Sequence, residues 1–378
     1  MKAGKQQTAY QIGITEMAVS LIAMIVGTGV IVLPRALAVE MDTTDGWITV
    51  IVSGGFVMLF VFIITKLQQK FPGRNFLQFL GEGIFGKWLS KLLALSFFVY
   101  FICVISFLSR FLAITIDIYL LPQTPTEVIV MILLLLSTYA ISKGVQGVIH
   151  LNIMFTPIVL SVAFLIIIFE IPEFDLLNLR PIMAEGFIPL FKGLKETLFS
   201  FLGIEILFFL MAYMKKSDIR AAPLLISIGI ISFLYFSIII ATFAIFGLNS
   251  TKVITFPMID LVKEIEIPGG VLERVEPIFI TIWFMSMFNT IAVAHLLADK
   301  LLKKELLPFV KGEILTALAV FIIFINTFIT KSYTELSLFG QWISTHGGVN
   351  IIACILVVFV TLWYRTKKNK TSIQEEQA

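Results

Sequence analysis

Residues 24–31 read Met-Ile-Val-Gly-Thr-Gly-Val-Ile, and their two glycines interrupt the apolar run 17–38. A second interruption, Phe-Leu-Gly-Ile-Glu at residues 201–205, lies inside the apolar run 194–214. Glycine is a poor helix former, so deep in a membrane it is tolerated mainly where a helix unwinds at a cavity or packs closely on a neighbour. Two such breaks at corresponding positions of two halves indicate a transporter-type binding site.

The composition decides the solvent of this chain. Of its 378 residues, 58% are hydrophobic and only 14% are charged, and 36 are Phe. No soluble arrangement hides that much apolar surface, so the chain must be surrounded by lipid. The net charge is only +3, and the basic residues are spread along the chain, which does not favour a nucleic-acid partner. We therefore predict an all-α integral membrane protein.

Ten stretches approach the roughly 20 residues that a membrane helix needs. We expect a single membrane domain over 1–378, built as two inverted five-helix repeats of about 14–169 and 186–364, with breaks in the first and sixth helices. Segment 186–200 is interpreted as an outer interfacial helix. A polar cytoplasmic tail, 365–378, is expected to be disordered. The predicted spans are 17–38, 46–66, 92–116, 127–142, 148–169, 195–214, 222–247, 275–298, 314–330 and 348–364.

The basic residues predict the orientation of the spans. Lys and Arg collect in alternate loops, which together with both termini carry 19 of the 28 basic residues. Since cytoplasmic loops carry the excess of Lys and Arg, we predict a multi-pass membrane protein with both termini in the cytoplasm. Arg35 and Arg110 lie toward the outer ends of the first and third spans and are interpreted as interfacial side chains that extend to the headgroups.

The two breaks predict the chemistry of the ligand. Half-helix N-termini offer free N–H groups to a carboxylate, and the freed carbonyls of the other halves suit an ammonium group or a small cation. A zwitterionic amino acid satisfies both. The break residues Gly27, Thr28, Gly29 and Gly203 are therefore candidate ligand-binding positions.

Polar side chains near the breaks are further candidates. Glu205 is acidic and lies near the centre of a span, which indicates a function; the alternative is a protonated, structural glutamic acid. Ser286, Asn289 and Thr290 share one face of the eighth span. They either line the cavity or bind a cation, or else form ordinary hydrogen bonds between helices. Tyr100 in the third span is a weaker candidate of the same kind.

Sequence motifs of enzymes and metal sites are missing. The chain has no His-Glu-x-x-His, no Gly-x-Ser-x-Gly, no paired intramembrane Asp and no phosphate-binding glycine loop. Cys103 and Cys354 lie in separate spans without metal-ligand spacing. We therefore predict no catalytic residue, no metal site and no cofactor.

Short motifs along almost the whole chain resemble those of one known family. They are Ile14-Thr15-Glu16, Gly27-Thr28-Gly29-Val30, Lys70-Phe71-Pro72-Gly73, Leu179-Arg180-Pro181, Phe201-x-Gly203-x-Glu205 and Arg274-x-Glu276 before Trp283. Each motif is weak alone, but their order and spacing are fairly specific. The chain resembles the spore germination permeases, the B subunits of spore germinant receptors, which form a branch of the amino acid–polyamine–organocation superfamily.

The resemblance implies a function beyond what the residues alone predict. It implies a nutrient sensor in the spore inner membrane, where binding of a small molecule, expected to be an amino acid, starts germination together with A and C subunits. The alternative is an ion-coupled secondary amino acid transporter; a channel is weaker, because one chain shows no ring of like side chains. The ligand pocket implied by the family comprises Gly27, Thr28, Gly29, Tyr100, Gly203, Glu205 and Thr290.

Overall fold

The computed structural model describes residues 10–81, 86–265 and 275–376, and these residues form helices with no strand among them. Six of the helices are long and apolar enough to cross a membrane. They are α3 (Gly46–Gln68), α5 (Gly86–Tyr119), α7 (Gly144–Glu170), α10 (Ala221–Val253), α12 (Glu276–Lys300) and α14 (Tyr333–Glu376).

Two further spans are broken, as predicted for the first and sixth. Helices α1 (Ile14–Ile25) and α2 (Gly29–Met41) meet at a bend of 48°. Helix α8 (Ile188–Ser200) meets Ile204–Tyr213, which contains α9 (Leu207–Leu210), at a bend of 46°. The segment predicted as an interfacial helix is thus the first half of the second broken span. Its buried face, which includes Gly193 and Thr197, packs on α2 and α3.

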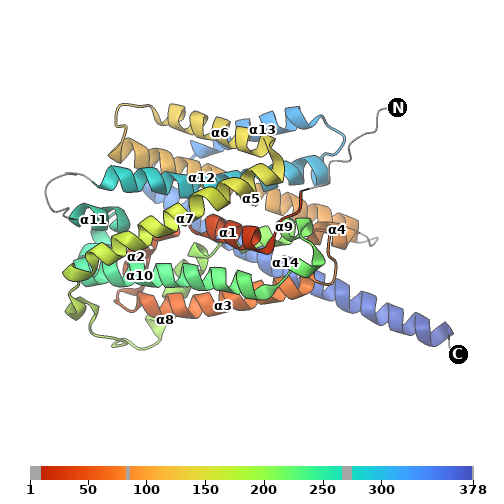
Figure 1. Ribbon diagram of the computed structural model, residues 1–378, viewed down its shortest axis with the longest axis horizontal. Coiled ribbons are helices and arrows are strands. Elements are labelled where there is room, and N and C mark those ends of the chain that lie inside the picture. Colours follow the sequence, from red (N-terminus) through yellow and green to blue (C-terminus); the bar gives the residue numbers. More distant parts are fainter. Residues whose placement is uncertain (1–9, 82–85, 266–274, 377–378) are drawn as a thin grey trace.

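Two apolar helices are shorter than a perpendicular span requires. They are α6 (Thr126–Ser142) and α13 (Gly312–Thr327), with 17 and 16 residues. By length and composition the described residues hold six spans, or eight if each bent pair is one span. The count of ten therefore stays a prediction. Two short helices, α4 (Phe76–Gly81) and α11 (Pro257–Glu264), lie at the ends of the bundle (Figure 1).

Helix α1 lies in the centre of the bundle, where it contacts α7, α10 and α12 (Figure 1). Helices α6 and α13 lie side by side along one edge, and α3 runs along the opposite edge with α8. Large apolar side chains such as Leu135 on α6, Phe321 on α13 and Phe359 on α14 are more than half exposed. Such a surface is stable only in lipid, which supports a multi-pass membrane protein.

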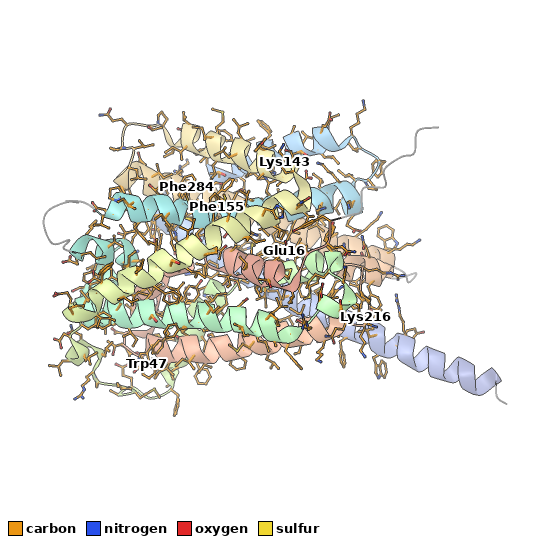
Figure 2. All side chains as sticks on the ribbon, in the orientation of Figure 1. Glu16, Trp47, Lys143, Phe155, Lys216 and Phe284 are labelled. Carbon is orange, nitrogen blue, oxygen red and sulfur yellow. The ribbon has the colours of Figure 1, made fainter. Side chains whose placement is uncertain are left out.

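The ends of the bundle agree with the predicted alternation of loops. Figure 2 shows Lys143 and Lys216 toward the same end of the bundle, and Trp47 toward the other. The last helix differs from expectation, because α14 continues through most of the predicted disordered tail to Glu376. The tail is rich in Lys, Glu and Gln, which are good helix formers, so the helix continues beyond the apolar part.

Candidate functional site

The two broken spans touch each other at their breaks. Gly203, in the second break, has a φ of 131°. Residues other than glycine rarely adopt this backbone conformation. A Cβ atom at Gly203 would lie 2.8 Å from Ile25 Cγ1 and 3.2 Å from the Ile25 backbone nitrogen. The second break therefore packs directly on the C-terminal end of α1, and only glycine fits there.

Tyr235 of α10 joins both breaks. Ile25 is the last residue of α1, and Ser200 is the last residue of α8. The Tyr235 hydroxyl donates to both of their carbonyl oxygens, at 3.1 Å and 3.0 Å. A Cβ atom at Gly29 would lie only 2.7 Å from this hydroxyl oxygen. Gly29 thus leaves the space that Tyr235 needs to reach carbonyls freed by the breaks.

Hydroxyl groups of α12 satisfy further carbonyls of the first break. The Ser286 hydroxyl donates to the carbonyl of Val26, and the Thr290 hydroxyl donates to that of Ala23 at 3.0 Å. These are hydrogen bonds between helices, and they also gather several oxygens beside the break. The Asn289 amide is buried, and neither of its polar atoms has a partner among the described residues.

A small cavity of about 60 Å³, the central cavity, lies at the meeting point of the breaks. The structure brings six of the seven predicted site residues to its wall: Gly27, Thr28, Gly29, Tyr100, Glu205 and Thr290. The seventh, Gly203, does not line the cavity but packs on α1. The rest of the wall, which the sequence did not single out for this role, consists of Met24, Ile25, Val104, Phe107, Leu108, Phe199, Ser200, Leu202 and Ile343.

Glu205 is the acidic side chain of this cavity, and it is fully buried. The Tyr100 hydroxyl donates to Oε1 at 2.8 Å, and the Gly203 N–H donates to Oε2 at 2.8 Å. The hydrogen bond from the Gly203 N–H can form whether the Glu205 carboxyl group is charged or neutral. If Oε1 carried the proton, Oε1 would instead donate to the Tyr100 hydroxyl. No ion pair with a basic side chain occurs for Glu205 in the described part of the chain, so the carboxyl group lacks a counter-charge.

Helix α14 closes the cavity on the side of Tyr100. Ile343 lines the cavity, and a Cβ atom at Gly347 would lie 2.7 Å from Tyr100 Cε2. The absence of a side chain at Gly347 lets α14 approach the Tyr100 ring closely. The orientation of the Tyr100 hydroxyl toward Glu205 is thereby held by packing from a helix late in the chain.

The described residues contain no group of three His, Cys, Asp or Glu side chains able to hold a metal ion. His295 instead lies 2.9 Å from the Ser137 hydroxyl, and His346 lies 2.9 Å from that of Ser96. Both imidazoles thus take part in contacts between helices.

The broken helices and the cavity between them define a membrane protein of the transporter fold built from inverted repeats. The fold is similar to that of a Na⁺-coupled sialic acid symporter, with a TM-score of 0.64 and 14% identity over 93% of this chain and 80% of the symporter. It is also similar to MHP1, a nucleobase-cation-symport-1 family transporter, with a TM-score of 0.62 and 14% identity over 91% and 78% of the two chains.

The sequence belongs to a narrower group within this fold. Residues 11–336 match the family described as spore germination protein, and the chain is a member of that family. It is 29% identical to spore germination protein YndE of Bacillus subtilis, over 91% of this chain and 94% of the relative. It is 28% identical to spore germination protein GerLB of Bacillus cereus, over 95% of each chain.

Proposed function

We propose that this chain is the nutrient-sensing subunit of a spore germinant receptor and that an amino acid binds in the central cavity. The observation that most supports the proposal is the meeting of both helix breaks at one cavity in a member of the spore germination protein family. A ligand in this position contacts both broken spans at once. Its binding free energy can therefore change how the two halves pack, which is the signal that starts germination.

The two charged ends of an amino acid match two parts of the cavity wall. The first two N–H groups of α2, those of Gly29 and Val30, have no backbone acceptor among the described residues and lie at the positive end of the helix, which suits a carboxylate. The buried carboxyl group of Glu205 suits an ammonium group, which would supply the missing counter-charge.

The remaining wall favours a small, apolar side chain. Val104, Leu108 and Ile343 surround the space with apolar groups, and the cavity holds only about 60 Å³. A large or charged side chain would require the wall to move or would leave a charge unpaired. We therefore propose a small aliphatic amino acid as the nutrient.

The setting of the chain is part of the same proposal. We place it in the spore inner membrane with both termini in the cytoplasm, in a complex with A and C subunits. The excess of Lys and Arg in alternate loops supports this orientation, as does the position of Lys143 and Lys216 at one end of the bundle (Figure 2).

A second function, ion-coupled amino acid transport, is supported by a separate observation. Ser286 and Thr290 lie beside carbonyl groups of α1, and such a group of oxygens suits a small cation. Two solved structures of similar fold are those of a Na⁺-coupled symporter and of a nucleobase-cation-symport-1 family transporter. A transporter would accumulate its ligand, whereas a sensor needs only to bind it.

Binding and uptake of radiolabelled L-alanine by the purified chain in liposomes separate these functions. We expect saturable binding without accumulation under an imposed Na⁺ or proton gradient. Gly27→Val should weaken binding at least tenfold, because a Cβ atom there meets only Thr290 Oγ1, at 3.5 Å, so the valine enters the cavity without displacing backbone. The matched control is Gly55→Val on α3, where a Cβ atom meets nothing within 4 Å.

Gradient-driven accumulation would replace the sensor by the transporter. Equal weakening by Gly27→Val and Gly55→Val would show that the effect does not come from the central cavity. Binding that Gly27→Val leaves unchanged would contradict the proposed site.

A further inference from the structure

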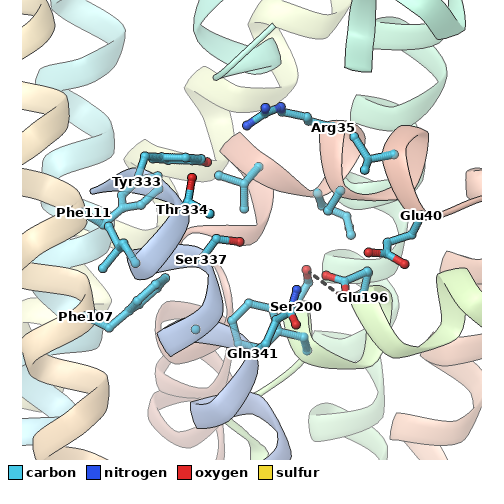
Figure 3. Close-up of a pocket in the computed structure, with 17 residues that line it drawn as sticks. Arg35, Glu40, Phe107, Phe111, Glu196, Ser200, Tyr333, Thr334, Ser337 and Gln341 are labelled. Atoms are coloured by element: carbon cyan, nitrogen blue, oxygen red, sulfur yellow. Dashed lines mark hydrogen bonds between the residues drawn. The ribbon is translucent and has the colours of Figure 1, made fainter. Parts of the chain in front are cut away.

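A second and larger cavity, the outer cavity of about 290 Å³, lies between α2, α5, α8 and α14 (Figure 3). It shares three residues of its wall, Phe107, Phe199 and Ser200, with the central cavity. A ligand that reaches the central cavity from this side must therefore pass through the outer one. The outer cavity lies toward the end of α2 that carries Glu40, which is the predicted outer side of the membrane.

Glu196 of α8 is the most unusual side chain of this wall. It is 91% buried, with 9% of its surface exposed, yet its carboxylate forms no hydrogen bond or ion pair within the described parts of the chain. The nearby Ser200 hydroxyl donates to the Glu196 main-chain oxygen at 3.2 Å and not to its carboxylate. The two carboxylate oxygens are not sealed off by protein, because they open into the cavity, and they remain available to a ligand there.

No basic side chain forms an ion pair with Glu196 within the described residues. The charge of Lys195 acts on the Glu196 carboxylate, but Lys195 is exposed to solvent and does not contact it directly. Arg35 lies at the other side of the cavity in Figure 3, where its Nε donates to the Lys252 carbonyl at 3.1 Å and its guanidinium lies 5.7 Å from the centre of the Tyr333 ring. Glu40, on the same side as Glu196, adds a second negative charge.

The rest of the wall suits an organic cation better than a hydrated metal ion. Phe107, Phe111 and Phe199 present aromatic rings, whose faces attract cations, and they exclude the water that a small inorganic ion would keep. A primary ammonium group has three N–H donors for carboxylate oxygens and an apolar remainder for the rings.

We infer that the outer cavity is a second binding site, which takes the ammonium group of a primary amine or amino acid on the Glu196 carboxylate. This site selects ligands with a positive charge before they reach the central cavity. It binds them in the adjoining cavity, on the predicted outer side of the two breaks. The existence of the outer site does not depend on the proposed function. Only the identity of its natural ligand, the same amino acid that binds in the central cavity, rests on that function.

Equilibrium binding of radiolabelled n-butylammonium to the full chain in lipid nanodiscs tests this site, with butyrate as the probe of opposite charge. We expect butylammonium to bind and butyrate not to bind. Glu196→Gln, which keeps the shape and removes the charge, should weaken butylammonium binding at least tenfold. Glu196→Asp should stay within about fivefold of the unmodified chain. Glu127→Gln is the matched control, because Glu127 is exposed in the first turn of α6 and does not line the outer cavity, and it should change binding less than threefold.

A second variant blocks the outer cavity without changing Glu196, so that a loss of binding cannot be due to misfolding around Glu196. Ser337 is exposed and lines the outer cavity, so Ser337→Trp should fill the cavity and abolish butylammonium binding without a change in thermal unfolding. Unchanged binding in Glu196→Gln or in Ser337→Trp would overturn the inference, and so would equal binding of butyrate.

The central-cavity variant Gly27→Val separates this inference from the proposed function. Butylammonium binding that persists in Gly27→Val supports the outer site, even if no amino acid binds to any variant and the proposed function fails. Butylammonium binding that Gly27→Val alone abolishes would place the amine in the central cavity. The outer site would then be rejected while the proposed function remained.

Discussion

The two helix breaks bend the chain by nearly the same angle, 48° and 46°, but by different means. In the first break no residue has a left-handed backbone, and Gly29 is needed because Tyr235 lies where a side chain would be. In the second break Gly203 has a φ of 131° and only glycine is suited to it. Glycine thus provides close packing alone in the first break, and both close packing and backbone freedom in the second.

The breaks also differ in what satisfies their backbone groups. The first break depends on other helices, since hydroxyls from Tyr235, Ser286 and Thr290 bond its carbonyls. The second break is bonded mainly from within, because the Glu205 carboxylate accepts the N–H of Gly203 two residues earlier, although Tyr235 also bonds the carbonyl of Ser200 at its start. Removing one bond should therefore loosen the first break only in part, while a change at Gly203 or Glu205 alters the second break itself.

The largest effect is expected at Gly203. Gly203→Ala places a side chain at a backbone conformation that costs about 1–3 kcal/mol, and its Cβ atom would lie 2.8 Å from Ile25 Cγ1. We expect a clear fall in the thermal unfolding temperature of the purified protein. Gly27→Ala is the matched control, with the nearest atom at 3.5 Å, and should change that temperature little. Equal shifts for both variants would contradict the distinction drawn between the breaks.

A smaller effect, on ligand binding rather than folding, is expected at Glu205. Glu205→Gln keeps an acceptor for the Gly203 N–H and a partner for Tyr100, so the break should persist. It removes the charge that we propose for the ammonium group, and a charged hydrogen bond contributes about 1.5–3 kcal/mol. L-alanine binding should weaken tenfold or more while thermal unfolding stays nearly unchanged. Unchanged binding would favour the alternative in which Glu205 is a protonated, structural residue.

The sequence predicted the breaks because glycine inside an apolar run is a strong local signal. It predicted Glu205 because an acidic residue in a span is costly and therefore rare. Tyr235 gave no such signal, since one tyrosine in the apolar run 222–247 fits ordinary packing. Its role depends on contacts with residues 35 and 210 positions away along the chain.

The last helix shows a second limit of hydropathy. The tenth span was predicted to begin at residue 348, but α14 begins at Tyr333 and places Ile343 in the wall of the central cavity. Residues 333–347, the first part of α14, include Gln341 and His346, which lower the mean hydropathy of this part of the helix. Gln341 lines the outer cavity and His346 contacts Ser96, so these polar groups are sheltered from lipid by contacts that the sequence does not reveal.

The smallest effect is expected at Tyr235, and it tests whether the first break depends on other helices. Tyr235→Phe keeps the ring, which packs edge-on against Phe201, and removes only the hydroxyl that bonds Ile25 and Ser200. A hydrogen bond contributes a net stabilisation of about 0.5–1.5 kcal/mol, so we expect a modest fall in unfolding temperature and weaker binding of L-alanine. Tyr364→Phe, at an exposed position on α14, is the control and should behave as the unmodified chain. Ser286 and Thr290 still bond the first break in this variant, so its unfolding temperature should fall less than that of Gly203→Ala. An equal fall would mean that the Tyr235 hydroxyl alone, rather than several shared contacts, holds the two breaks together.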